Sequence, residues 1–446
     1  MGTASITGHV QRACAQSLSV LLALLFATAC QAQAAGAALH GSGGVNSKQQ
    51  QAKPYLVLVS IDGFRWDYMD RKPTPNLHRI AAAGARAERL LPVFPTLTFP
   101  NHYSIATGLY PAHHGLVAND FPGRDRGRWY SLRKRETVED PAFYGGEPIW
   151  VAAETQGMVS AAFFFVGTEA PVMGVPPSHW RSYDKKIPGD KRVEQVLAWL
   201  AGPAEQRPHL YTLYFEDVDD SSHWYGPGSV ENAAAIARVD HYIGRLLDGI
   251  GKLPHAGKVN LILLSDHGQG AYVENQQPYL LTDHVNLNGA RIVEGGSYLF
   301  LYLDDPDPTR AAAIAATVNA SWGHGHAYLT TDAPAQWHVD GNPSFPDVIL
   351  MPDAGHAVLS SMDKVGKITA GDHGWAPESP DMHGFFVACG PNIRRGVATG
   401  AVRNIDVYPL MLSILGLKGP QPIDGDAASL AEILYTDRSN QTCFKQ

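Results

Sequence analysis

Four short apolar runs along the chain predict buried β-strands. They are residues 55–61 (YLVLVSI), 161–166 (AAFFFV), 210–215 (LYTLYF) and 260–265 (NLILLS). Runs this short, without alternation of polar and apolar positions, are typical of strands covered on both faces.

The segments between these runs carry apolar residues at helical spacing. They are residues 76–84, 147–157, 192–202 and 231–251. Strands that alternate with helices predict an α/β fold with a mostly parallel central sheet flanked by helices. Residues from about 285 to 370 alternate less clearly and contain many turn-forming residues, so we expect an inserted smaller subdomain there.

The N-terminus has the features of an export signal. Residues 17–29 (SLSVLLALLFATA) form an apolar stretch that is too short to span a bilayer and ends in small residues. Residues 27–29 predict a cleavage site, so 1–29 is interpreted as a signal peptide; 32–34 (AQA) is a second candidate. Cys30 could instead carry a bacterial lipid anchor. We therefore expect a periplasmic or secreted protein, without a transmembrane span.

The rest of the chain divides into three parts. Residues 30–53 are small and polar and predict a flexible tether, 54–418 a folded domain, and 419–446 a C-terminal tail. Once the signal and Cys30 are removed or modified, only Cys389 and Cys443 remain. In an exported protein they have one possible pairing, which would tie the tail to the domain; the alternative is two free buried thiols.

Composition limits the function classes. A chain of 446 residues with 45% hydrophobic content can bury a large core. The net charge is −8, only 17% of the residues are charged, and there is no long basic block. These values argue against a stable nucleic-acid partner and leave small molecules as the expected substrates. Nothing in the chain specifies an oligomeric state.

Acidic and histidine residues follow three of the predicted strands. They are Asp62 after 55–61, Asp219 and His223 after 210–215, and Asp266 with His267 after 260–265. The carboxyl ends of parallel strands lie on one rim of a sheet, where these carboxylates would repel one another unless a cation lay between them. Mixed Asp and His ligands suit zinc, with manganese or cobalt as alternatives. One such pair alone would indicate only a solvated acid and a structural histidine; three strand ends favour a metal site.

The segment 94–108 (FPTLTFPNHYSIATG) raises two interpretations of Thr98. As a helix N-cap, Thr98 would accept a hydrogen bond from the first turn, with Pro100 tolerated there and Gly108 ending the helix. A helix N-terminus also favours anions, so a hydroxyl beside a metal could instead attack phosphorus.

Taken together, these segments resemble the nucleotide pyrophosphatase/phosphodiesterase family of the alkaline phosphatase superfamily. The resemblance covers roughly residues 54–418. It is carried, in order, by VSIDGFR, FPTLTFPNHYSIATGLYPAHHGLVAND, GEPIW, YFEDVDDSSHWYGP, LSDHG and GDHGW…MHGFFVACGP.

The resemblance implies an alkaline-phosphatase-like catalytic domain with two Zn²⁺ per subunit. One ion would be held by Asp219, His223 and His373, and the other by Asp62, Thr98, Asp266 and His267. Thr98 would be both ligand and nucleophile, and Asn119 would bind a phosphate oxygen. His383 competes with His373 for the first site; we prefer His373 because the family's histidine opens an HG motif well before CGP.

The resemblance also assigns stacking against the nucleotide base to Phe99 and Tyr183, which would line one wall of the substrate pocket. Trp129 and Tyr130 are further candidates for this wall, and core packing is the alternative for each of the four residues. Three histidines of the Thr98 segment are expected to be packing or surface residues: His102, His113 and His114. Three features depart from the family pattern: Leu97 replaces a frequent lysine, Gln269 replaces a common methionine, and residues 165–171 (FVGTEAP) differ near the substrate wall.

The expected function is an exported, zinc-dependent phosphodiesterase/pyrophosphatase. It would cleave nucleotide phosphodiester or phosphoanhydride bonds to a nucleoside 5′-monophosphate through a phosphothreonine. One alternative is a phosphodiesterase for choline-type lipid headgroups, which would differ only in the pocket wall. Another is a non-catalytic exported protein that binds metal or phosphate. A sulfatase is disfavoured because residues 98–101 (TFPN) lack the Cys or Ser and the Arg of its C/S-x-P-x-R segment.

Overall fold

The computed structural model describes residues 39–41, 43–435 and 443–444. The predicted signal peptide, Cys30 and the tether up to residue 38 lie outside the described residues. The central sheet has nine strands in the order β1-β8-β7-β9-β2-β10-β19-β3-β20. Their bounds are β1 Leu39–Gly41, β2 Tyr55–Ile61, β3 Ala85–Ala87, β7 Ser160–Phe163, β8 His179–Arg181, β9 Leu210–Phe215, β10 Val259–Leu264, β19 Phe386–Cys389 and β20 Val397–Thr399.

The sheet is mostly parallel, as predicted. β8, β7, β9, β2 and β10 form one parallel block, and β20 pairs parallel with β3. The antiparallel pairs are β1 with β8, and β19 with both β10 and β3. The first and third apolar runs match β2 and β9 along their whole length. The second ends early because Phe164 adopts a left-handed backbone with φ 65°.

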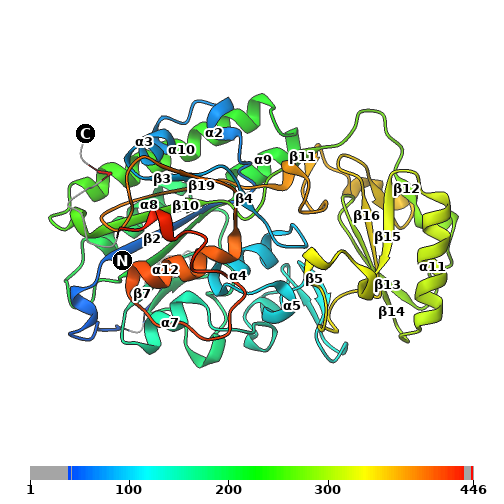
Figure 1. Cartoon of the computed structure of the whole chain (residues 1–446), viewed down its shortest axis with the longest axis horizontal. Helices are drawn as coiled ribbons and strands as arrows, with labels where there is room; N and C mark the ends of the chain where they lie inside the picture. Colours follow the sequence, from blue (N-terminus) through cyan, green and yellow to red (C-terminus); the bar gives the residue numbers. More distant parts are fainter. Residues whose placement is uncertain (1–38, 42, 436–442, 445–446) are drawn as a thin grey trace, which may run out of the picture.

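Helices cover both faces of this sheet (Figure 1). One face packs against α3 Pro75–Ala83, α8 Gly189–Leu200 and α10 Val230–Gly251, and the other against α4 Thr98–Thr107, α7 Ile149–Thr155 and α12 Val407–Leu415. The remaining α-helices among the described residues are α2 Tyr68–Arg71, α5 Pro111–His114, α6 Arg135–Val138, α9 Asp217–Tyr225 and α11 Pro308–Ser321. Short strands complete the fold: β4 Leu90–Leu91, β5 Asp120–Pro122, β6 Trp129–Ser131, β11 Gly270–Ala271, β12 Tyr279–Leu280, β17 Val358–Leu359, β18 Gly371–Asp372 and β21 Val402–Arg403.

The wholly apolar sequence of β2 follows from its position in the middle of the sheet. Leu56 and Leu58 belong to the core cluster around α4, α7 and α12, whereas Val57 and Val59 belong to the cluster around α3, α8 and α10. Successive side chains of a strand point to opposite faces, so a strand covered on both faces must be apolar throughout.

A second, smaller sheet lies at one end of the molecule, beside α11 (Figure 1). It is antiparallel in the order β13-β14-β16-β15, with β13 Ala290–Glu294, β14 Leu299–Leu303, β15 Gly325–Leu329 and β16 Val348–Pro352. Leu299 and Leu301 pack with α11, while Phe300 and Ile349 on the other face join the main core. The smaller sheet is therefore anchored to the large one by shared core residues.

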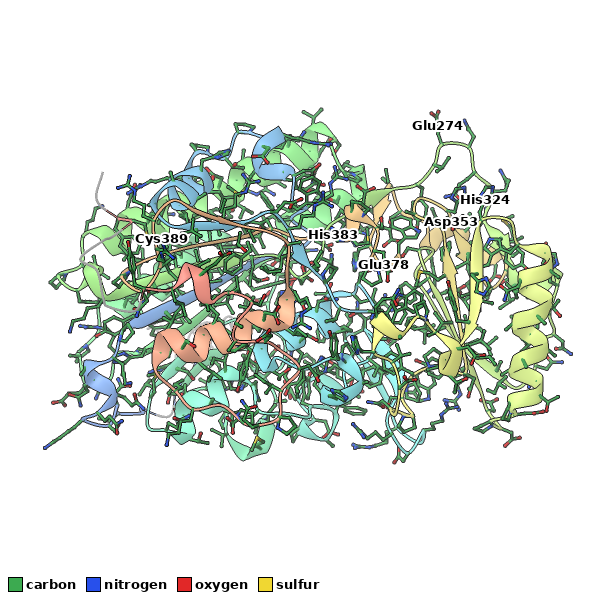
Figure 2. The ribbon with its side chains drawn as sticks, in the orientation of Figure 1. Glu274, His324, Asp353, Glu378, His383 and Cys389 are labelled. Carbon is green, nitrogen blue, oxygen red and sulfur yellow. A yellow bond between two sulfur atoms is a disulfide. The ribbon has the colours of Figure 1, made fainter. Side chains whose placement is uncertain are left out.

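The C-terminus is fixed to the central sheet by a disulfide between Cys389 of β19 and Cys443 (Cys389 is labelled in Figure 2). Of the two alternatives for these cysteines, the structure has the pair. Among the residues that the structure describes, no helix combines the length and apolarity needed to cross a bilayer.

Candidate active site

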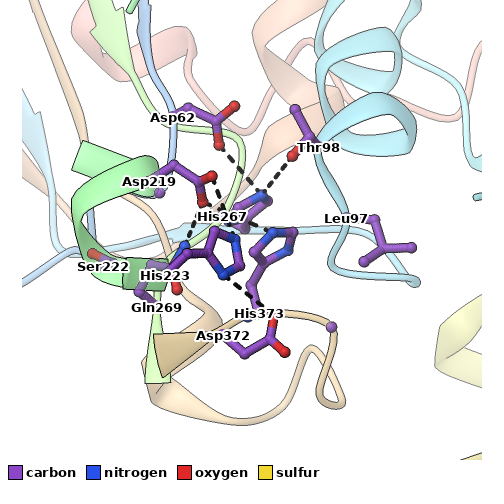
Figure 3. A network of polar contacts seen from close by, with 12 residues as sticks. Asp62, Leu97, Thr98, Asp219, Ser222, His223, His267, Gln269, Asp372 and His373 are labelled. Atoms are coloured by element: carbon purple, nitrogen blue, oxygen red, sulfur yellow. Dashed lines mark hydrogen bonds and ion pairs between the residues drawn. The ribbon is translucent and has the colours of Figure 1, made fainter. Parts of the chain in front are cut away.

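Three adjacent parallel strands deliver the predicted ligands to one rim. Asp62 directly follows β2, and Asp266 and His267 lie just beyond β10. After β9 the chain enters α9, and Asp219 and His223 lie four residues apart on this helix. Because β9, β2 and β10 are neighbours with the same direction, their carboxyl ends bring these side chains together (Figure 3).

Gly63 makes the close approach of α9 possible. Its φ is +65°, and a Cβ at this position would lie 2.9 Å from both Cα and Oδ1 of Asp219. A side chain on residue 63 would therefore push α9 away from the end of β2. The glycine of VSIDGF thus sets the separation between Asp62 and Asp219.

The first predicted ligand set converges. His223 Nε2 lies 3.4 Å from Asp219 Oδ2, and His373 Nε2 lies 3.8 Å from Asp219 Oδ1. The ligand atoms of all three residues lie within 4.8 Å of one another. His373 reaches them because β18 pairs with β11, which follows the Asp266-His267 turn.

The second predicted set also converges. His267 Nε2 lies 3.0 Å from Asp266 Oδ2 and 3.5 Å from Asp62 Oδ1. Thr98 Oγ1 lies 3.3 Å from the same Nε2 atom. All seven side chains that the sequence proposed as ligands therefore meet at this rim.

Backbone carbonyls orient the three histidine rings. Nδ1 of His223 donates to Gly371 O at 3.0 Å, Nδ1 of His267 to Gly268 O at 3.0 Å, and Nδ1 of His373 to Thr96 O at 2.8 Å. A carbonyl oxygen only accepts, so the proton lies on Nδ1 in each neutral ring. Nε2 is left with its lone pair toward the carboxylates, which is the tautomer that binds a metal.

The charges of the site call for a cation. Burial, together with the neighbouring carboxylates of Asp266 and Asp219, raises the pKa of Asp62 well above its ordinary value. Burial also raises the pKa of Asp219. Asp62 Oδ1 and Asp266 Oδ2 are buried and have no hydrogen-bond partner among the described residues. Divalent cations would satisfy these oxygens and remove the repulsion, so the donor set fits divalent metal ions.

Thr98 is the first residue of α4, and Leu97 occupies the N-cap position without a side-chain cap. The interpretation of Thr98 as an N-cap is therefore wrong. Its half-buried hydroxyl instead lies at the positive end of the helix and faces His267 (Figure 3). Gly108 ends the helix in the left-handed region with φ 69°, as predicted.

Asn119 lies beside this helix start. Its Oδ1 accepts a hydrogen bond from the backbone N–H of Phe99 at 3.1 Å. The bond assigns the oxygen of the amide and leaves the Nδ2 group as the donor end of the side chain.

His102 is fully buried, as a packing residue would be, and it also contacts residues of the site. Its Nδ1 lies 2.9 Å from the Thr98 carbonyl oxygen and 3.2 Å from Asp266 Oδ2, and its Nε2 lies 2.8 Å from Ser60 Oγ. The sequence feature that could have indicated this contact is the position of His102 four residues after Thr98, which places both residues on the same face of a helix.

Three other histidines lie outside the predicted ligand sets. His114 is buried against Ser104, and burial lowers its pKa to about 3. The exposed His113 pairs with Asp424. His383, labelled in Figure 2, donates from Nε2 to Pro377 O at 3.0 Å. It is in none of the metal-binding groups found among the described residues.

Two of the predicted wall aromatics are accessible. Phe99 is partly buried, and Tyr183 is 41% exposed. The Tyr183 ring centroid lies 6.1 Å from that of Tyr214, whose hydroxyl donates to Asp62 Oδ2 at 2.6 Å. Tyr214 therefore contacts both Tyr183 and the carboxylate of Asp62.

The other two wall candidates behave differently. Tyr130 is wholly buried and its hydroxyl lies 2.9 Å from that of Tyr144, so core packing explains it. Trp129 is partly buried and packs edge-on against Tyr302 of the smaller sheet.

Comparisons with known proteins find a family and individual relatives that are similar to this chain. The family described as "Type I phosphodiesterase / nucleotide pyrophosphatase" matches residues 56–376. Human ectonucleotide pyrophosphatase/phosphodiesterase family member 1 is 33% identical over 388 residues, which is 85% of this chain and 42% of that protein. A venom phosphodiesterase of Naja atra is 33% identical over 88% of this chain and 48% of its own length. The chain thus spans less than half the length of these curated relatives.

Solved structures give the same result for the fold. Murine ectonucleotide pyrophosphatase/phosphodiesterase 5, solved as an inactive variant in complex with AMP, superposes with a TM-score of 0.80 and 27% identity. The match covers 86% of this chain and all of that one. The human protein of the same name matches with the same TM-score and 28% identity.

Proposed function

Because the chain belongs to the type I phosphodiesterase/nucleotide pyrophosphatase family, whose named members are hydrolases, we propose that it cleaves nucleotide phosphodiester or phosphoanhydride bonds. The product would be a nucleoside 5′-monophosphate. One observation carries the proposal: the Thr98 hydroxyl lies at a helix N-terminus, 3.3 Å from a histidine that also contacts two buried carboxylates.

Two zinc ions are proposed as cofactors. Asp219, His223 and His373 would hold one, and Asp62, Asp266, His267 and Thr98 the other. When bound, zinc supplies Lewis acidity toward phosphoryl oxygens and lowers the pKa of oxygen ligands.

Thr98 is the proposed nucleophile. Its oxygen would attack phosphorus in line, form a phosphothreonine ester and release the leaving group; water would then hydrolyse the ester. The positive end of α4 stabilises negative charge at this position. Asn119 would donate from Nδ2 to a non-bridging phosphate oxygen, because its Oδ1 is already engaged by Phe99.

The nucleoside would be recognised by stacking. Phe99 follows the nucleophile directly, and the half-exposed ring of Tyr183 connects through Tyr214 to Asp62. Base–aromatic stacking contributes about 1–3 kcal/mol per base. The AMP complex of the related murine protein supports a nucleotide ligand.

We also propose that the protein is exported. The support is the apolar segment 17–29 of the sequence and the similarity to a venom phosphodiesterase. Export agrees with the Cys389–Cys443 disulfide, since such bonds persist in oxidising compartments. A lipid anchor on Cys30 remains the alternative to simple cleavage.

A panel of four chromogenic substrates tests the proposal. The zinc-loaded protein is given p-nitrophenyl thymidine 5′-monophosphate, p-nitrophenylphosphorylcholine, p-nitrophenyl phosphate and p-nitrophenyl sulfate. We expect the first to be hydrolysed with the highest kcat/KM. Preference for the choline ester would indicate that the substrate is a choline-type lipid headgroup and not a nucleotide. Hydrolysis of none of the four compounds would refute an enzymatic role.

A further inference from the structure

The side chain of Gln269 is buried beside the candidate metal site and contacts one of its carboxylates. Gln269 is fully buried, and its Nε2 donates a hydrogen bond to Asp219 Oδ1 (Figure 3). The Oε1 atom of the same amide is buried without a partner among the described residues. A buried amide with half of its hydrogen-bonding capacity unused costs stability, so its presence where the family resemblance predicts methionine calls for a role particular to this chain.

The backbone around Gln269 is held from three sides. Gly268 N donates to Met382 O at 2.9 Å, Arg65 Nη1 donates to Gln269 O at 3.2 Å, and Gly270 pairs with Asp372 in the β11–β18 ladder. The residue therefore lies between His267, two positions before it, and His373, which follows Asp372. Its side chain crosses from this fixed turn to α9.

Asp219 is the carboxylate for which such a contact matters most. It belongs both to the group with His223 and His373 and to the group with Asp62 and His267. An unrestrained Asp219 could thus turn toward either position. The Gln269 donor occupies Oδ1 and leaves Oδ2, which lies 3.4 Å from His223 Nε2, as the freer oxygen.

We infer that Gln269 is a positioning residue that commits Asp219 to the cation held by His223 and His373. It acts through Asp219 and is not assigned any contact with substrate. This inference rests on the proposed two-zinc site. Mutation of a residue that hydrogen-bonds a metal ligand typically lowers the affinity for the metal by about 10- to 100-fold.

The experiment measures zinc affinity, not turnover. Metal-free wild type, Gln269→Met and Gln269→Asn are titrated with zinc against a chromophoric chelator, and the two dissociation constants are fitted. Gln269→Met keeps the size of the side chain and removes the donor, whereas Gln269→Asn keeps the amide but shortens its reach. Gln336→Met is the matched control, because Gln336 is exposed and also donates to a carboxylate, that of Glu378, at 3.1 Å.

We expect both Gln269 variants to bind one zinc ion about 10- to 100-fold more weakly and the other as tightly as wild type. The melting temperature of metal-free Gln269→Met should stay close to that of wild type, because the loss of a half-satisfied buried amide offsets the loss of its hydrogen bond to Asp219. Two unchanged zinc affinities would overturn the inference. So would equal weakening of both ions together with a lower metal-free melting temperature, which would indicate a structural role. If wild type itself binds no pair of zinc ions, the proposed function fails instead.

Discussion

Removal of the Asn119 side chain gives a quantitative test of the proposed transition-state contacts. Asn119 Oδ1 accepts the Phe99 N–H at 3.1 Å, so Nδ2 is left as the donor that would bind a phosphate oxygen in the proposed mechanism. Loss of one such preorganised donor costs about 3 kcal/mol of transition-state stabilisation. At 1.36 kcal/mol per factor of ten, Asn119→Ala should lower kcat by about 160-fold.

A second variant separates the donor from the helix contact. Asn119→Asp retains an oxygen for the Phe99 N–H but replaces the donor with a negative charge that faces an anionic substrate. It should be at least as inactive as Asn119→Ala. The assay is steady-state hydrolysis of p-nitrophenyl thymidine 5′-monophosphate, with zinc content measured for each variant. The reasoning is refuted if Asn119→Ala, with full zinc content, keeps a kcat within about threefold of wild type.

Four further outcomes are expected. Thr98→Ala should abolish turnover while leaving most of the zinc in place, and mass spectrometry of quenched wild type, but not of the variant, should find a phosphorylated Thr98 peptide; substantial activity in the variant would exclude the covalent route. Removal of metal by a chelator should abolish activity and zinc should restore it, whereas activity of a fully metal-free preparation would contradict the proposed cofactor. Tyr183→Ala should lower kcat/KM for the nucleotide substrate about 5- to 160-fold, corresponding to 1–3 kcal/mol of stacking, with little change for bis-p-nitrophenyl phosphate; equal losses on both would indicate a general structural defect. Cys443→Ser should lower the free energy of unfolding by about 4 kcal/mol, because the bridge closes a loop across a sequence separation of 54; equal denaturant midpoints of variant and wild type would show that the bridge does not stabilise the fold.

The central part of the fold could be predicted because both faces of its strands are buried. An apolar run such as 55–61 has few alternatives to a covered strand, and the ends of β2 and β9 match the prediction. The strands β3 and β20 have three residues each and were not predicted. β3 is placed by its pairing with β19, and β20 by its pairing with β3, and both pairings join distant parts of the chain. Local patterns carry no information about such pairing.

The site was predictable where strand order brings ligands together, and less so where a ligand comes from elsewhere. Asp62, Asp219 and Asp266 follow adjacent strands, so their convergence follows from a parallel sheet. His373 depends on the β11–β18 ladder, and its choice over His383 came from the family resemblance and not from spacing. The spacing of His102 four residues after Thr98 indicates that the two share a helix face, but its contacts with Ser60 and Asp266 depend on the packing of α4, which the spacing does not reveal.

The most direct test of the dinuclear site is an anomalous-difference map from crystals of the zinc-loaded protein, with data collected at the zinc absorption edge. We expect two peaks about 3.5–4 Å apart. One should be coordinated by Asp219, His223 and His373, and the other by Asp62, Asp266 and His267, with Thr98 Oγ1 in contact with it. No peak at these residues, or a single peak that leaves Asp62 and Asp266 uncoordinated, would contradict the account.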